Sequence, residues 1–118
     1  MEIMKTLRHA HVVSFKEAWI EKGCTVCIVV GYCEGGDLMS RLQRSDGKAF
    51  AEDKVLGLFV QLALALEYLH GKRILHRDVK CSNVFLGGDG LLKVGTWGTY
   101  CVGVLLRLTY LATRTSAC

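Results

Sequence analysis

The sequence lacks any apolar run long enough to cross a lipid bilayer. The stretches Val55–Leu66 and Leu108–Ala112 fall well short of the roughly 20 residues that a membrane helix needs. The opening Met1–Lys5 also has no charged segment leading into an apolar core, so it does not resemble a secretory signal. We therefore predict no membrane partner and a cytoplasmic location, with the nucleus and the cytoskeleton as alternatives.

Basic runs and paired metal-binding motifs are missing as well. The net charge is only +4, and no cluster of basic and aromatic residues accompanies it, which argues against nucleic acid as a partner. Cys24 and Cys27 have the C-x-x-C spacing, but no second C-x-x-C or histidine pair completes a four-ligand zinc site. We interpret both as small apolar residues of a strand, and the six cysteines as reduced thiols.

Acidic residues are absent beyond Asp89, and proline is absent from the whole chain. After Lys93 only Arg107 and Arg114 carry a charge, so the last part of the chain differs in character from the rest. The lack of proline is unusual but decides little. With 118 residues, 51% hydrophobic and 22% charged, the composition is that of one small globular domain.

Hydrophobic periodicity predicts mixed secondary structure in the first third of the chain. Apolar residues at helical spacing make Met1–Arg8 the end of a helix. Val12–Ile20 and Thr25–Val30 are rich in β-branched and aromatic residues and predict two strands. The turn at 21–23 joins them as a hairpin, and the glycines after Glu34 end the second strand.

The middle of the chain predicts two helices and a short hairpin. Asp37 can cap a helix over Leu38–Gln43 through its carboxylate. Ala51–His70 is a long helix with Gly71 as its stop, and it is apolar almost all round, which predicts burial inside something larger. An exposed face on this helix would favour aggregation. Three short apolar runs follow at Arg73–Leu75, Asn83–Leu86 and Leu91–Val94, and a turn at Gly87–Gly90 predicts that the last two form a hairpin.

The segment Leu75–Asn83 reads L-H-R-D-V-K-C-S-N and carries the chemistry. Its spacing matches H-R-D-x-K-x-x-N, the catalytic loop of protein kinases. A carboxylate at Asp78 can orient a substrate hydroxyl and accept its proton. The charge of Lys80 can offset the negative charge that develops on a phosphoryl group, and the Asn83 amide oxygen can bind magnesium.

The resemblance to protein kinases extends over most of the chain. His9–Val13 resembles the H-P-N-I-V segment of kinases, and Ile28–Leu38 resembles the last strand of the small lobe, the hinge and the start of the next helix. The amino-acid sequence of residues 19–27 and 31–38 is similar to that of NIMA-related serine/threonine kinases, including plant and algal members. A lysine two residues after Asp78 is the serine/threonine kinase pattern.

That resemblance implies a nucleotide site and further roles in the loop. Val30 would be the gatekeeper, the backbone of Gly31 and Cys33 would bind the adenine edge, and Phe85 would lie beneath the ring. In the loop, His76 would pack inward and Arg77 would pair with a phosphorylated residue. The cofactors implied are ATP and Mg²⁺, and the partner implied is a protein substrate.

The expected fold class is therefore α+β, a protein-kinase-like fragment. It would hold the end of the N-lobe (the end of helix αC and the last two strands) and the first half of the helical C-lobe. We expect a partial N-lobe and hinge over residues 1–33, a partial C-lobe with the catalytic loop over 34–98, and a divergent activation-segment tail over 99–118.

Departures from the family pattern bear on activity. The Gly-rich loop and the ATP-contacting lysine are absent, and the chain ends before the A-P-E motif. Glu2 is interpreted as a helix-surface residue rather than the family's αC glutamate. Leu92–Gly98 aligns with K-L-G-D-F-G, so Thr96 and Trp97 replace the magnesium-binding aspartate and its phenylalanine neighbour. Asn83 alone is a poor site for a cation that prefers charged oxygens.

Three functional hypotheses follow. The first is a partial serine/threonine kinase domain, inactive as an isolated chain, whose family transfers the ATP γ-phosphate to protein hydroxyls. A Gly-rich loop encoded upstream would favour it. The second is a non-catalytic pseudokinase fragment that binds a partner or competes with a full-length kinase. A stable fold that captures a partner without phosphoryl transfer would favour it. The third is a chain that does not fold alone and has no function.

Overall fold

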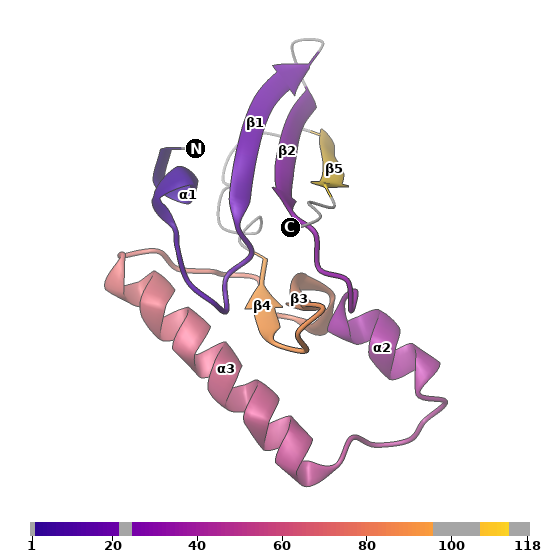
Figure 1. The fold of residues 1–118 in the computed structure, drawn as a ribbon. Coiled ribbons are helices and arrows are strands. Elements are labelled where there is room, and N and C mark those ends of the chain that lie inside the picture. Colours follow the sequence, from indigo (N-terminus) through magenta and orange to yellow (C-terminus); the bar gives the residue numbers. More distant parts are fainter. Residues whose placement is uncertain (1, 22–24, 96–106, 114–118) are drawn as a thin grey trace.

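A computed structural model describes residues 2–21, 25–95 and 107–113 of the chain. Figure 1 shows a small sheet at one end, two helices at the other, and a short hairpin between them. Within the described part, no helix is both long and apolar enough to span a membrane. The elements are α1 (Glu2–Thr6), β1 (Phe15–Glu21), β2 (Thr25–Gly31), α2 (Leu38–Arg44), α3 (Glu52–Gly71), the 3-10 helix η1 (Cys81–Asn83), β3 (Val84–Leu86), β4 (Leu92–Val94) and β5 (Arg107–Thr113).

The first two strands form the predicted antiparallel hairpin. β2 agrees with the prediction to one residue, whereas β1 begins three residues later than predicted, at Phe15. The reason is that the residues before β1 pair with β4: Val13 N–H donates to Val94 O at 3.0 Å, and Val94 N–H donates to His11 O at 2.9 Å. Cys27 is buried in β2, as its interpretation as an apolar strand residue predicts, while Cys24 lies outside the described residues.

The predicted cap of α2 is confirmed. The Asp37 carboxylate accepts the Ser40 backbone N–H at 2.8 Å and the Ser40 hydroxyl at 2.7 Å. These two hydrogen bonds to Ser40 hold the pKa of Asp37 below its ordinary value. Capping therefore fixes where the chain turns from the segment after β2 into α2, and Leu38 packs against the main core.

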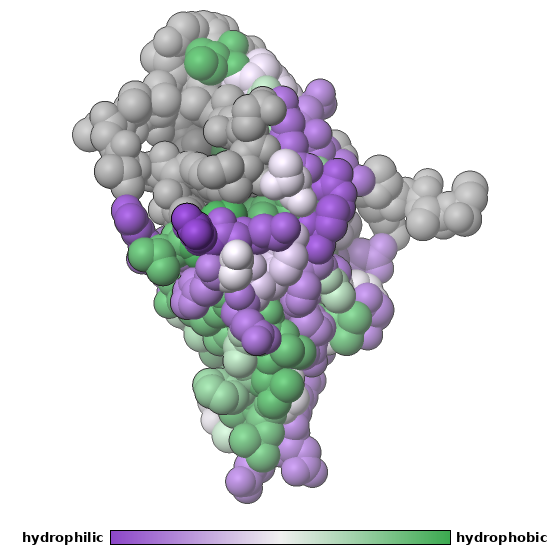
Figure 2. All heavy atoms as spheres, turned by 90° about the vertical axis from the view of Figure 1, so that its left-hand side faces the viewer, coloured by the Kyte–Doolittle hydropathy of each residue, from purple (hydrophilic) through white to green (hydrophobic). Residues whose placement is uncertain are grey.

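The long helix α3 is confirmed within one residue at each end. Of its side chains only Ala65 and Leu69 are fully buried, both at 0% exposure. A large apolar face stays exposed, and Figure 2 shows hydrophobic surface gathered over the lower part of the molecule. We call this set of exposed side chains the apolar face of α3: Val55, Leu56, Phe59, Val60 and Leu64.

The chain leaves α3 differently from the prediction. Gly71 is the last helical residue rather than the stop after it, and the left-handed residue that follows is Arg73, with φ of 60°. The apolar run Arg73–Leu75 does not form a strand, because a left-handed residue cannot continue an extended strand. Instead Ile74 N–H donates to Leu69 O at 2.9 Å, and the Ile74 side chain is buried.

The predicted hairpin of β3 and β4 is confirmed. Val84 pairs with Val94 and Leu86 with Leu92. The turn between the strands is closed by Gly90 N–H donating to Gly87 O at 3.0 Å, and Gly90 takes a left-handed φ of 78° that suits glycine. Alternate side chains of this hairpin enter the main core, which also holds Leu7, Val12, Ala65, Leu69 and Ile74.

The strand β5 was not predicted. It pairs in parallel with β2, from Thr25 opposite Arg107 to Gly31 opposite Thr113, which gives the sheet order β1-β2-β5. The rest of the predicted activation-segment tail, and Thr96 and Trp97, lie outside the described residues.

Candidate functional site

The loop after Ile74 is anchored by a buried histidine. His76 is 2% exposed, and its Nε2 atom bonds to the backbone oxygen of Gly95. Its Nδ1 atom accepts the backbone N–H of Asp78 at 3.3 Å. A carbonyl oxygen can only accept and a backbone N–H can only donate, so these contacts fit the neutral imidazole with its proton on Nε2. The prediction that His76 packs inward is confirmed.

The structure brings the three predicted catalytic residues together. Arg77, with φ of 64°, turns the chain so that the next side chain faces η1. The Asn83 amide nitrogen donates to the Asp78 backbone oxygen at 2.9 Å and to the carboxylate Oδ2 at 2.8 Å. Lys80 Nζ lies 3.0 Å from the same Oδ2 atom. Asn83 is 8% exposed, so a buried amide holds a carboxylate at the surface.

The electrostatics of this cluster keep Asp78 ionised at neutral pH. The hydrogen bond from Lys80 is the largest cause that lowers the pKa of Asp78, and the hydrogen bond from Asn83 lowers it further. Both donors stabilise the charged carboxylate, and this is why the pKa of Asp78 falls. The cluster therefore presents a carboxylate that is oriented on one side and exposed on the other.

The predicted adenine-binding residues also lie together. Val30 and Cys33 are buried in one small cluster, and Phe85 packs against it. Burial raises the pKa of the Cys33 thiol. Gly31 N–H donates to Ser14 O at 2.7 Å, which ties the end of β2 to the residue before β1.

The chain after β2 is tied to β3 by two reciprocal bonds. Gly35 N–H donates to Leu86 O and Leu86 N–H donates to Gly36 O, both at 2.9 Å. A hollow of about 380 Å³ lies beside this segment, lined by Tyr32, Cys33, Glu34, Gly35, Gly36, Asp37, Arg44 and Phe85. Because β3 follows η1 directly, Phe85 at this hollow and Asn83 beside Asp78 lie on two adjoining elements, β3 and η1.

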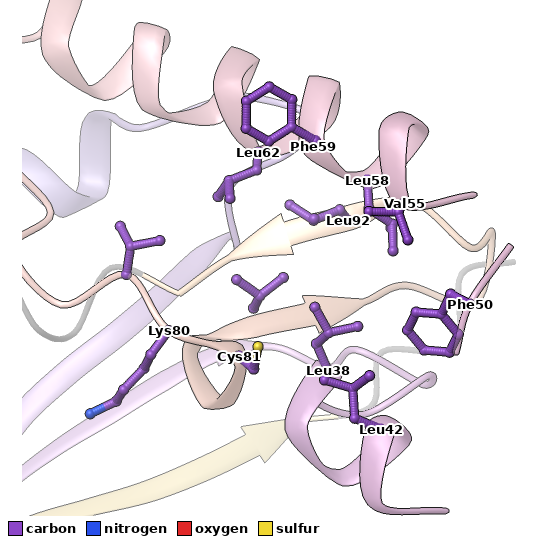
Figure 3. A pocket seen from close by; sticks show the side chains of 12 residues that line it. Leu38, Leu42, Phe50, Val55, Leu58, Phe59, Leu62, Lys80, Cys81 and Leu92 are labelled. Atoms are coloured by element: carbon purple, nitrogen blue, oxygen red, sulfur yellow. The ribbon is translucent and has the colours of Figure 1, made fainter. Parts of the chain in front are cut away.

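A second hollow of about 380 Å³ lies between α2, α3 and the predicted catalytic loop. Figure 3 shows Leu38, Leu42, Phe59 and Leu62 around it. Among the described residues that line this hollow, Lys80 alone is charged and the others are apolar, so the hollow is unsuited to phosphate groups. The sequence signal for this hollow was the all-round apolar character of α3.

The residues described near Asp78 do not make a complete magnesium site. With both donor contacts of the Asn83 amide made to Asp78, its Oδ1 atom is the oxygen left for a cation. The Asp78 carboxylate is engaged by Lys80. In residues 2–21, 25–95 and 107–113 there is no group of three or more potential metal ligands. Magnesium prefers near-octahedral oxygen coordination, usually with carboxylates, so these residues fit it poorly.

Gln61 is a supporting residue that the sequence did not predict. Its Oε1 atom accepts Leu92 N–H at 2.8 Å and its Nε2 atom donates to Gly57 O at 3.2 Å. It thereby joins α3 to β4. The available signal was a single glutamine inside an otherwise apolar helical run.

Comparison with known proteins agrees with this geometry. The Protein kinase domain family matches residues 1–104, and the chain belongs to that family. Over 98 residues, 83% of this chain, it is 47% identical to Serine/threonine-protein kinase Nek3 of Oryza sativa subsp. japonica, of which 17% is covered. It is 43% identical over 96 residues, 81% of this chain, to Serine/threonine-protein kinase Nek1 of Mus musculus, of which 8% is covered.

A third relative gives the same result. Serine/threonine-protein kinase Nek6 of Oryza sativa subsp. japonica is 43% identical over 98 residues, 83% of this chain and 18% of the relative. The resemblance to NIMA-related kinases is confirmed at this level. The chain spans less than a fifth of the length of each of these three relatives.

Proposed function

We propose that this chain is part of a serine/threonine protein kinase domain whose catalytic loop is built by Asp78, Lys80 and Asn83. The observation that carries the proposal is that two side chains contact the same Oδ2 atom of Asp78. The Asn83 amide nitrogen lies 2.8 Å from it and Lys80 Nζ lies 3.0 Å from it. In this proposal residues 1–33 are the end of the N-lobe with the hinge, residues 34–98 belong to the C-lobe, and residues 99–118 are an activation-segment tail.

Each residue has a distinct role in the proposed reaction. Asp78 orients the substrate hydroxyl and takes its proton as the oxygen–phosphorus bond forms and the bond from the γ-phosphorus to the bridging oxygen of ATP breaks. Lys80 moves from Asp78 to the transferring phosphoryl group and offsets its charge. Asn83 keeps Asp78 in place.

The adenine site is proposed at the end of β2. The backbone of Gly31 and Cys33 would bind the polar edge of the base, with Val30 behind it and Phe85 beneath it. The support is that Val30, Cys33 and Phe85 share one small apolar cluster. Such a cluster can cover the faces of a flat aromatic ring while backbone groups bind its edge.

The isolated chain is expected to be inactive. A kinase needs a lysine–glutamate pair and a magnesium-binding aspartate in place, and here Thr96 stands at the aspartate position. The test is transfer of labelled γ-phosphate from ATP with Mg²⁺ to casein, by the purified chain and by Asp78→Asn. We expect equal background from both. Transfer by the parent chain that Asp78→Asn abolishes would overturn the expected inactivity.

A second candidate is a non-catalytic module that binds a protein partner or competes with a complete kinase. The replacement of the expected aspartate by Thr96 favours it. A melting-temperature measurement with and without ATP and Mg²⁺ separates the possibilities. A cooperative melt that rises with ATP would favour a nucleotide-binding module. A melt indifferent to ATP would argue against a nucleotide site in this chain, and no cooperative melt would favour the hypothesis that it does not fold alone.

A further inference from the structure

A cluster of aromatic and basic side chains joins residues 8–11 to the helical part of the molecule. The His9 ring stacks on the Tyr68 ring of α3, with centroids 4.7 Å apart and planes at 20°. Arg8 N–H donates to the Tyr68 hydroxyl at 2.8 Å. Figure 1 shows the segment between α1 and β1 dipping toward α3 and β4. None of these contacts belongs to the proposed catalytic loop or adenine site.

The histidine pair in this cluster uses its ring nitrogens in opposite ways. His9 Nδ1 accepts the backbone N–H of His11 at 3.1 Å, so this atom must be unprotonated. His11 Nδ1 lies 2.9 Å from Leu92 O, and since a carbonyl only accepts, that nitrogen carries a proton. Protonation of the His11 ring would leave its hydrogen bond to Leu92 O intact. Protonation of the His9 ring at Nδ1 would break the hydrogen bond that this atom accepts from the His11 N–H.

The surroundings of His9 oppose a positive charge. The two rings also meet edge to face, with centroids 5.6 Å apart. Burial, then His11 and then Lys93 lower the pKa of His9. The titratable and charged groups packed here come from three parts of the chain. They are Arg8 and His11 of the segment itself, Tyr68 of α3 with Lys72 directly after that helix, and Lys93 of β4. Lys72 Nζ lies 5.9 Å from the Tyr68 ring centroid, and Lys93 donates to Ala10 O at 2.7 Å.

We propose that His9 is a proton-operated latch: protonation of its Nδ1 atom opens the turn from His9 to His11 and loosens residues 8–11 from α3 and β4. Val12 and Val13 stay in place because their side chains are buried and Val13 is bonded to Val94. The latch thus alters how firmly the segment leading into the sheet is attached to the helical part.

The sign of the pH effect follows from the neutral folded form. An ordinary histidine has a pKa near 6.5, and the pKa of His9 is lowered by folding. The unfolded chain then binds more protons than the folded chain in the window below pH 6.5. The stabilising contribution of neutral His9 is complete above that value and is lost as the pH falls through the window to the folded pKa.

Amide hydrogen exchange on the purified chain at pH 7.5 and 5.5, corrected for intrinsic rates, tests the latch. We expect protection of the Arg8 and His11 amides to fall several-fold at the lower pH, with the Val13 amide unchanged. Equal protection at both pH values would overturn the proposal. NMR signals of the histidine rings that show no chemical-shift dispersion at pH 7.5 would also overturn it, because the latch requires the folded state with neutral His9.

A matched pair of variants assigns the effect to His9. His9→Asn keeps a side-chain acceptor for the N–H two residues on, as in an Asx turn, but cannot titrate. It should hold the protection of the His11 amide at pH 5.5. His70→Asn removes an exposed imidazole from α3 outside the cluster and should behave like the parent chain. A parent-like loss of protection in His9→Asn would overturn the proposal.

Discussion

At the scale of single residues, the proposed catalytic loop depends on one buried amide. Asn83 binds Asp78 twice, whereas the sequence motif predicted only a magnesium-binding role for Asn83. The motif did not predict that Lys80 pairs with Asp78 itself. That pair is half exposed, with side-chain exposures of 55% and 42%, so solvent screens it and Lys80 can leave it for a phosphoryl group.

Gly35 is the residue whose replacement should damage the proposed hinge most directly. A Cβ atom there would lie 2.7 Å from Leu86 Cβ and 2.8 Å from Leu86 O, so the two backbones would have to separate. We expect Gly35→Ala to lower the free energy of unfolding by about 1–3 kcal/mol, measured by urea denaturation.

Gly57→Ala in α3 is the matched control for that change. A Cβ atom there meets nothing within 4 Å, and alanine favours helix. We expect it to raise the free energy of unfolding by about 0.5–1 kcal/mol. Equal effects of the two substitutions would contradict the close approach of the segment after β2 to β3.

At the scale of elements, local patterns predicted most of the fold. The periods of the apolar residues located α3, the β1–β2 hairpin and the β3–β4 hairpin. The conformation of the apolar run Arg73–Leu75 could not be predicted, because an apolar pattern does not reveal the left-handed backbone of Arg73. The pairing of β5 with β2 could not be predicted, since a parallel partner lies far away in the sequence and no local turn fixes its register.

The two sides of α3 should respond very differently to truncation. Leu69 is 0% exposed and Leu64 is 43% exposed, although both are leucines of the same helix. We expect Leu69→Ala to cost about 2–5 kcal/mol of unfolding free energy and Leu64→Ala no more than about 0.5 kcal/mol. Thermal or urea unfolding measures both. A cost for Leu64→Ala close to that of Leu69→Ala would contradict the placement of the helix.

At the scale of the whole molecule, the apolar face of α3 should limit solubility. Phe59 is 65% exposed and Leu56 is 54% exposed. A contiguous exposed apolar patch favours aggregation. We expect Phe59→Gln and Leu56→Gln together to raise the concentration at which light scattering appears, whereas Glu67→Gln on the same helix should not. No gain from the double variant would contradict an exposed apolar face.

The central claim, that the loop around Asp78 is a kinase catalytic loop, is tested most directly by transplanting it. Leu75–Leu86 of this chain would replace the matching segment of Serine/threonine-protein kinase Nek3 of Oryza sativa subsp. japonica, a relative 47% identical over the aligned residues. Phosphoryl transfer to casein would then be measured for this chimaera, for its Asp78→Asn variant, and for Cys81→Ser as a control at a position that the motif leaves open.

We expect the chimaera and Cys81→Ser to transfer phosphate at comparable rates, and Asp78→Asn to lower kcat by about 10²–10⁴-fold. An inactive chimaera, or an Asp78→Asn variant as fast as its parent, would contradict the assignment of the catalytic loop.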